Sequence, residues 1–262
     1  MSSSVRRTAG HGTYANSEFW KLRAAGYNKL EWATRSDYLE WFLAHGDFKP
    51  TDVVLDAGTG TGVVAHAVAP LVTRVIGIDL SLAMLSQALD TKHNNEEFVL
   101  EDIRSLRYPA ANFDKITARM VFHHILTDTV HAVRECHRVL VPGGRMLLSE
   151  GVPPHESLKA WYREMFTLKE ERLTFMPQDL VNLMQQGGFA CVSLSTYVLP
   201  QVSVRNWLEN SGLPQPKQNA IMRMHVELDG AGQKFYNMKV LQDDVLIDMQ
   251  YVTVLGVKAS VK

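Results

Sequence analysis

The sequence contains only two cysteines, Cys136 and Cys191, among 262 residues. Two cysteines are too few for a disulfide framework or for a metal site built from thiolates, and we expect no metal site. No run is long and apolar enough to span a bilayer, and the first twenty residues lack the apolar stretch of a signal peptide. These absences predict a cytoplasmic protein without stable membrane insertion.

The sequence also lacks an excess of charge of either sign. There are 27 Lys and Arg residues against 28 Asp and Glu residues, which gives a formal net charge of −1. No basic cluster stands out, so the electrostatic footprint of a nucleic-acid-binding surface is missing and we expect no nucleic-acid partner. With 46% hydrophobic residues, the chain can bury the core of one large domain.

Short apolar segments alternate with helical patterns in the central part of the chain. The predicted strands are residues 52–57, 73–79, 96–102, 113–119 and 145–151. Helices are expected between most of these strands. This alternation is typical of βαβ units, and therefore of an α/β protein with a parallel sheet and helices on both faces.

The segments that flank this alternation are expected to add helices. Residues 17–45 are predicted to form one or two helices. Two late strands, 190–200 and 243–258, are expected to pair antiparallel and enclose a helical insert, residues 201–242. A connection of this length with its own helices is usually functional.

A glycine-rich turn follows the first predicted strand, in the stretch VVLDAGTGTGVVA, residues 53–65. A strand, a glycine turn and a helix N-terminus together are typical of nucleotide binding, because the ligand can approach the backbone closely there. Gly58, Gly60 and Gly62 follow the spacing G-x-G-x-G, so the dinucleotide pattern G-x-G-x-x-G fails at Val63. No lysine follows as in a P-loop. The turn therefore favours a ligand without a pyrophosphate.

Acidic residues lie at the carboxyl ends of three successive predicted strands, as Asp56, Asp79 and Asp102. Parallel strands bring these ends to one edge of the sheet, which is where open α/β sheets bind ligands. Asp79 follows the glycines at about the twenty-residue separation from which an acid reaches ribose hydroxyls. Three carboxylates disfavour a phosphate but suit a ligand with a cationic centre and an amine.

Taken together, these stretches resemble the class I S-adenosylmethionine-dependent methyltransferases of the small-molecule type, a group that includes the ubiquinone and menaquinone methyltransferases. The resemblance covers residues 50–155 most strongly. The motifs, in the family's order and spacing, are VVLDAGTGTG, VIGIDLSLAML, FVLEDIRSL, FDKITARMVFHHI and RECHRVLVPGGRMLLSE. The resemblance implies a Rossmann-like, mostly parallel seven-stranded sheet and S-adenosyl-L-methionine as the cofactor. It also implies methyl transfer to a small, apolar or aromatic acceptor at oxygen, nitrogen or carbon.

The resemblance further implies which residues contact the cofactor. The turn is expected to follow its methionine part, with Asp79 on the ribose and the backbone of Ala118–Arg119 facing the methionine amino group. Leu80 and Ile103 would enclose the adenine, with Asp102 near its amine. The predicted cofactor residues are Asp56, Ala57, Gly58, Thr59, Gly60, Gly62, Asp79, Leu80, Met84, Asp102, Ile103 and Arg119.

His123 and His124 follow the fourth predicted strand, in the region that faces the substrate in this fold. A hydroxyl or thiol acceptor must lose a proton during methyl transfer, and a histidine with a near-neutral pKa can accept it. Both are candidate catalytic bases, with His124 preferred; the alternative is that one of them only packs or caps a helix. Arg119 would bind a substrate or cofactor carboxylate, or pair with a local acid such as Glu150.

The N-terminal segment, residues 1–48, and the insert, residues 201–242, are expected to close as a lid over the acceptor in the main domain, residues 49–262. The predicted substrate contacts are Tyr14, Tyr27 and Met222. For the aromatic residues the alternative is core packing. For the insert the alternatives are a homodimer interface and completion of the core.

A competing hypothesis is a module that binds NAD or a nucleoside without transferring a methyl group. Val63 at the third glycine position and Asp102 both favour methyl transfer over this alternative. Enzymes of this fold that methylate amino groups of nucleic-acid bases usually carry an Asn/Asp-Pro-Pro-aromatic motif after the fourth strand. This chain has ARMVFHH there, which favours a small-molecule acceptor.

Overall fold

A single twisted sheet runs through the computed structural model, which describes residues 6–7 and 18–260. The sheet order is β1-β4-β3-β2-β5-β6-β9-β7, and β8 pairs with β9. The strands are β1 (Arg6–Arg7), β2 (Val53–Ala57), β3 (Arg74–Asp79), β4 (Glu96–Leu100), β5 (Phe113–Arg119), β6 (Leu140–Val152), β7 (Cys191–Ser203), β8 (Lys239–Val240) and β9 (Val245–Val257).

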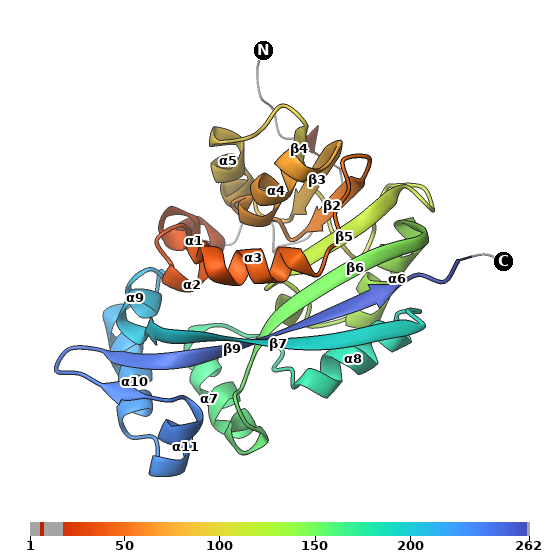
Figure 1. Cartoon of the computed structure of the whole chain (residues 1–262). Helices are drawn as coiled ribbons and strands as arrows, with labels where there is room; N and C mark the ends of the chain where they lie inside the picture. The colour runs from red at the N-terminus through yellow and green to blue at the C-terminus, as the bar shows by residue number, and fades with distance from the viewer. Residues whose placement is uncertain (1–5, 8–17, 261–262) are drawn as a thin grey trace.

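Helices connect and flank these strands (Figure 1). The α-helices are α1 (Glu18–Tyr27), α2 (Glu31–Thr34), α3 (Ser36–Ala44), α4 (Val63–Val68), α5 (Leu82–Asp90), α6 (Thr129–Val139), α7 (Lys159–Lys169), α8 (Pro177–Gln186), α9 (Val204–Glu209), α10 (Gln215–Val226) and α11 (Gly230–Phe235). The 3₁₀ helices are η1 (Ala69–Leu71), η2 (Phe122–His124) and η3 (Glu156–Leu158).

The sheet has nine strands within the described residues, where seven were predicted. Seven strands have at least five residues each, and these form the predicted α/β, Rossmann-like sheet. The other two, β1 and β8, have two residues each and pair with β4 and β9. A two-residue strand is too short to leave a periodic pattern in the sequence, which is why both were missed.

The parallel and antiparallel parts of the sheet occupy different ends of it. Strands β4, β3, β2, β5 and β6 are parallel. The last strand, β9, is antiparallel to both β6 and β7. The predicted antiparallel pairing of the two late strands is therefore confirmed. In Figure 1, β7 and β9 cross the whole molecule, and helices α9–α11 lie at one end of this pair.

Side chains that alternate along the parallel strands form two cores. Val54 in β2 belongs to the core formed with α3, α4 and α5, which includes Phe42 and Val64. The next residue, Leu55, belongs to the core on the opposite face with α6 and α8, which includes Val133 and Leu183. Helices therefore cover both faces, as the βαβ pattern predicts (Figure 1).

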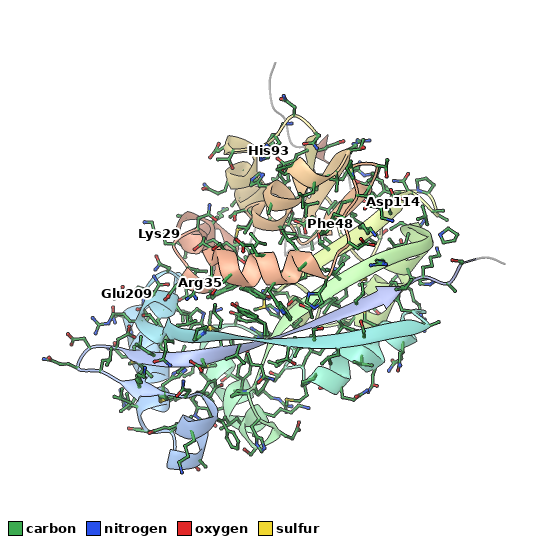
Figure 2. The ribbon with its side chains drawn as sticks, in the orientation of Figure 1. Lys29, Arg35, Phe48, His93, Asp114 and Glu209 are labelled. Atoms are coloured by element: carbon green, nitrogen blue, oxygen red, sulfur yellow. The ribbon has the colours of Figure 1, made fainter. Side chains whose placement is uncertain are left out.

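A third core connects the N-terminal helices, α7 and the insert to the far ends of β7 and β9. Its members include Trp32, Trp207, Ile221 and Tyr251. Asn206 of α9 also binds the α1–α2 turn, because its side chain accepts from the Glu31 N–H at 2.9 Å and donates to the Lys29 carbonyl at 3.1 Å. Figure 2 shows Lys29 and Glu209 on the same side of the molecule.

Helix α3 is part of the folded body. Tyr38 is fully buried, and its ring stacks on Tyr251 with centroids 4.2 Å apart. Its hydroxyl shares a hydrogen bond with Ser149 Oγ at 3.0 Å, and Thr253 Oγ1 donates to the same oxygen at 2.9 Å. The lid hypothesis for the N-terminal segment therefore concerns α1 and α2.

Replacing Tyr38 should show how firmly α3 is fixed. We expect Tyr38→Phe to lower the free energy of unfolding by about 1 kcal/mol, because it removes one buried hydrogen bond. Tyr38→Ala should cost about 3–5 kcal/mol, because it also leaves a cavity. Urea unfolding followed by circular dichroism measures both. A loss below about 1 kcal/mol for Tyr38→Ala would instead mean that α3 detaches easily.

Candidate active site

A cavity of about 510 Å³ lies at the carboxyl ends of the parallel strands. Its volume falls in the range of roughly 300–1,000 Å³ that is typical of small-molecule sites. Strands β3 and β5 lie on opposite sides of β2, because the chain builds β3 and β4 on one side and then crosses back to place β5 on the other. Open α/β sheets bind ligands at such a switch point. The walls come from the ends of β2 to β5, from α1 and from the segment that follows α7.

The three glycines of the turn have different roles. Gly58, Gly60 and Gly62 all have φ between 56° and 84°, the left-handed region that favours glycine. A Cβ on Gly58 would collide with Val121, and a Cβ on Gly62 would collide with His66. A Cβ on Gly60 would meet nothing within 4 Å. Backbone conformation and protein packing therefore already require glycine at Gly58 and Gly62, and only at Gly60 is the space beside the backbone open to a ligand.

Two acids hold the glycine turn in place. Asp56 is buried and accepts hydrogen bonds from Thr59 Oγ1 at 2.6 Å and Thr117 Oγ1 at 2.7 Å. Asp79 accepts from the Gly60 N–H at 2.9 Å and the Ser81 N–H at 2.8 Å. Removal from bulk water raises the pKa of Asp79 to about 6. Asp79 therefore connects the turn to Ser81, the residue that precedes α5.

The wall beyond Asp79 is mostly apolar. Leu80, Met84 and Ile103 line it. Ser81 is the N-cap of α5, and its side chain accepts from the Met84 N–H at 3.3 Å. Asp102 also lines the cavity, but its carboxylate is bound by Arg104 through Nη2 at 2.7 Å.

His123 is buried and bound to Glu150, with 2.5 Å between its Nδ1 and Glu150 Oε2. The other carboxylate oxygen accepts from the backbone N–H groups of Phe122 at 2.7 Å and His123 at 3.2 Å. Burial raises the pKa of Glu150 to about 7 and lowers the pKa of His123 well below its usual value. Burial, then the neighbouring His123, likewise lowers the pKa of His124. Both imidazoles are neutral at physiological pH, but a lowered pKa also makes each a weaker base.

Arg119 does not form the ion pair with Glu150 that was one of its two predicted roles. Its Nη2 donates to the Ala33 carbonyl at 3.1 Å. Its Nη1 is buried and has no hydrogen-bond partner among the described residues. An unsatisfied buried donor costs about 1–3 kcal/mol, so an acceptor group bound in the cavity would be stabilised there.

A buried charged cluster was missed entirely by the sequence analysis. Arg23 Nη1 lies 2.7 Å from Glu170 Oε2, and Lys169 Nζ lies 2.8 Å from Glu170 Oε1. Arg172 Nη1 lies 3.8 Å from the same Oε1, and all four side chains are at most 6% exposed. In the sequence these residues belong to LKEER, 168–172, and to a distant helix. Such a charged run at a helix end normally lies in water, so nothing in its pattern indicates burial.

The cavity brings together most of the predicted site residues. Those that line it are Asp56, Gly58, Thr59, Gly60, Asp79, Leu80, Met84, Asp102, Ile103, Arg119, His123, His124 and Tyr27. Ala57 and Gly62 do not line it. Met222 lines a separate surface depression beside Arg205 and Gln218, and Trp207 is the insert residue that reaches the main cavity. Tyr14 lies outside the described residues.

His123, His124 and Glu170 also have ligand atoms within 4.8 Å of one another, close enough for a shared metal ion. Their surroundings do not fit a cation. Arg23 and Lys169 already contact the Glu170 carboxylate, and Arg172 lies next to it. Like charges at such distances repel, so the cluster is better suited to an anion.

Known proteins show the same motifs and fold. A family model described as a methyltransferase domain matches residues 55–148. A demethylmenaquinone methyltransferase of Thermotoga maritima is 31% identical over 163 residues, which cover 52% of this chain and 69% of the relative. This chain belongs to the S-adenosylmethionine-dependent methyltransferases. The uncharacterized methyltransferase YcgJ of Bacillus subtilis is 28% identical over 180 residues, covering 64% of this methyltransferase and 69% of YcgJ.

Solved structures agree with this fold. The crystal structure of YcgJ matches with a TM-score of 0.77 at 22% identity, covering 87% of this methyltransferase and 100% of that chain. A putative methyltransferase of Bacillus halodurans matches with a TM-score of 0.74 over 86% of this chain. Within the described ranges, no helix combines the length and the apolar character needed to cross a membrane.

The free space at Gly60 leads to a prediction about cofactor binding. We expect Gly60→Val to weaken the binding of S-adenosylhomocysteine by about tenfold or more, because the new side chain would occupy the cavity. Left-handed backbone strain should also cost about 1–3 kcal/mol of stability.

Gly143→Val is the matched control, since Gly143 has φ of 80° and an added Cβ would make only an ordinary contact of 3.6 Å with Ser260 Oγ, away from the cavity. Thermal unfolding should show similar destabilisation in both variants, while calorimetry should show lost affinity only in Gly60→Val. Normal affinity in a folded Gly60→Val would exclude close ligand approach at this residue.

Proposed function

We propose that this methyltransferase moves the methyl group of S-adenosyl-L-methionine to a small-molecule acceptor bound beside His123 and His124. The observation that carries the proposal is the Asp79 carboxylate, held at the switch point by the Gly60 and Ser81 N–H groups and lining the cavity. Each of its oxygens uses one lone pair on the backbone. The remaining lone pairs can accept hydrogen bonds from a pair of ribose hydroxyls.

The two ends of the cofactor would meet walls of different chemistry. Leu80, Met84 and Ile103 form an apolar surface suited to adenine. The unpaired Nη1 of Arg119 suits the methionine carboxylate, since charge-assisted hydrogen bonds of arginine to carboxylates are strong. The Asp102–Arg104 pair would lie near the adenine edge. The bound cofactor supplies an electrophilic methyl group on a positively charged sulfur.

The protein's part in the reaction is mainly positioning. An in-line displacement gains most from holding the acceptor close to the methyl group in a site without water. Trp32 and Tyr27 pack edge to face, with ring centroids 5.9 Å apart, and both line the cavity. Burial raises the pKa of Tyr27, so its hydroxyl stays a hydrogen-bond donor. Where the acceptor loses a proton, neutral His124 is the candidate to receive it.

The lid remains part of this proposal. Trp207 of α9 and residues of α1 line the cavity, and Asn206 binds α9 to the α1–α2 turn. These contacts favour joint movement of α1, α2 and α9 over the acceptor. Four further predictions remain proposals. The lack of a nucleic-acid partner and the cytoplasmic location rest on composition, and the homodimer rests on the insert. The fourth is the division of the chain at residue 48.

The names of relatives favour a small acceptor. They include ubiquinone biosynthesis O-methyltransferase of Pseudomonas aeruginosa, 33% identical over 102 residues that cover 43% of that protein. Another is phosphoethanolamine N-methyltransferase 2 of Caenorhabditis elegans, 34% identical over 129 residues that cover 29% of it. These acceptors differ in chemistry, so the choice of acceptor depends on the side chains that line the cavity of each protein.

Asp79→Asn tests the cofactor site, because it keeps the shape of the side chain and removes its charge. We expect the affinity for S-adenosylhomocysteine at pH 8 to fall by about ten- to a hundredfold, the equivalent of roughly 1.5–3 kcal/mol. In the wild type, affinity should also fall as the pH drops through about 6, because protonation removes an acceptor for the ribose hydroxyls. The variant should lack this pH dependence.

Isothermal titration calorimetry from pH 5 to pH 8 measures both effects, and Glu97→Gln, which removes a carboxylate paired with Arg74, is the charge control. Unchanged affinity in folded Asp79→Asn would remove Asp79 from the site. NAD serves as the competing ligand. If NAD raised the unfolding temperature and S-adenosylhomocysteine did not, the proposed function would be wrong.

A further inference from the structure

The end of α7 and the segment after it place two cations, Lys169 and Arg172, beside one buried carboxylate, that of Glu170. Arg23, Lys169 and Arg172 surround the single carboxylate of Glu170. Glu150 is the other buried acid nearby, but it is bound to His123 and burial raises its pKa to about 7. Burying an excess of charge is costly unless a partner of opposite sign is supplied.

Arg172 has a donor that the protein leaves unused. Its side chain is 4% exposed, and its Nη2 has no hydrogen-bond partner among the described residues. The guanidinium carbon lies 4.2 Å from the centre of the Phe166 ring, which fixes the orientation of the group. Lys169 is packed similarly, with its Nζ 5.7 Å from the Trp207 ring centre. Both side chains line the cavity.

Arg172 and Lys169 lie on the side of the cavity where the methyl acceptor is proposed to bind, beside the two histidines. The segment after α7 is fixed to the histidine turn, because the Leu173 N–H donates to the His123 carbonyl at 2.8 Å. Asp79 and the glycine turn, where the ribose is proposed to bind, belong to the part of the lining that the ends of β2 and β3 provide. The carboxylate of the cofactor already has a candidate partner in Arg119. The unused donor of Arg172 is therefore left for a second ligand.

The surface next to the two cations is apolar. Phe166 and Trp207 border the main cavity, and so do Tyr162 and Met249. The same four side chains also border a small adjoining cavity of about 30 Å³ between α7, α9 and β9. A ligand at this place would meet positive charge at one end and rings and aliphatic groups at the other.

We propose that the methyl acceptor carries a carboxylate or phosphate group that binds to Arg172 and Lys169, while its apolar body extends along Phe166 and Trp207. This inference rests on the proposed methyl transfer and adds the chemical class of the acceptor. An oxyanion would accept from Arg172 Nη2 and balance the excess charge. Arg23 would strengthen the attraction from the side of α1.

The test uses the full chain saturated with S-adenosylhomocysteine and measures the unfolding temperature with three millimolar probes. Benzoate represents a carboxylate on a ring, inorganic phosphate represents a phosphate group, and benzamide is the neutral analogue of benzoate. We expect benzoate or phosphate to raise the unfolding temperature and benzamide to leave it unchanged. The anion that raises the unfolding temperature shows whether the acceptor carries a carboxylate or a phosphate group. An equal effect of benzamide, or no effect of either anion, would overturn the proposal.

Arg172→Met keeps much of the apolar stem on Phe166 and removes the charge. It should weaken binding of the active anion by about tenfold or more, while the affinity for S-adenosylhomocysteine alone stays within about threefold. The ligand-free variant should unfold at the same or a higher temperature than the wild type, because an uncompensated charge has been removed. If Arg172 served only to stabilise the fold, its replacement would instead lower that unfolding temperature.

Lys169→Met is the second variant and Arg205→Met the control, since Arg205 lies on α9 outside this cavity. If these variants lost affinity for S-adenosylhomocysteine together with affinity for the anion, the cluster would bind the cofactor and the proposal would be refuted. Failure of the wild type to bind S-adenosylhomocysteine at all would refute the proposed function. Normal cofactor binding without an anion response would refute only the present inference.

Discussion

The ends of parallel strands β2, β3, β4 and β5 meet at one edge of the sheet, and the acids, glycines and histidines of the cavity depend on this geometry. Helices that cover both faces leave this edge as the place where polar groups can gather without disturbing a core. Asp56 and Asp79 use backbone and hydroxyl donors at the edge to fix the glycine turn. Burial then changes the pKa of the acids and histidines. The same geometry therefore sets both the shape of the cavity and the protonation of the side chains that line it.

Sequence reasoning worked where the signal was local. Apolar alternation predicted the long strands, and a strand followed by an acid or glycine predicted which residues meet at the edge. Asp79, Gly60 and His124 were found in this way, and all three line the cavity. Their positions depend on strand ends, which a periodic pattern marks well. The family resemblance relied on these same local stretches.

The residues that were missed depend on contacts between distant segments. Arg23 and Glu170 are 147 positions apart, and no pattern in either segment indicates that they meet. Met222 was placed in the site because of its composition, but helical periodicity does not say which surface a helix face covers. Gly58 and Gly62 have the conformation of ligand-binding glycines, yet the neighbours that exclude their side chains are Val121 and His66. Only the packed structure distinguishes these causes.

The order in which β9 joins the sheet has a consequence for synthesis on the ribosome. This strand is made after β7, yet it lies between β6 and β7 and supplies the partner of both. Until residues 245–257 have left the exit tunnel, two long strand edges have no partner, and an exposed edge can pair with other chains. The nascent protein therefore needs its last strand to become resistant to aggregation. Shielding by a chaperone would matter most in the interval between the emergence of β7 and that of β9.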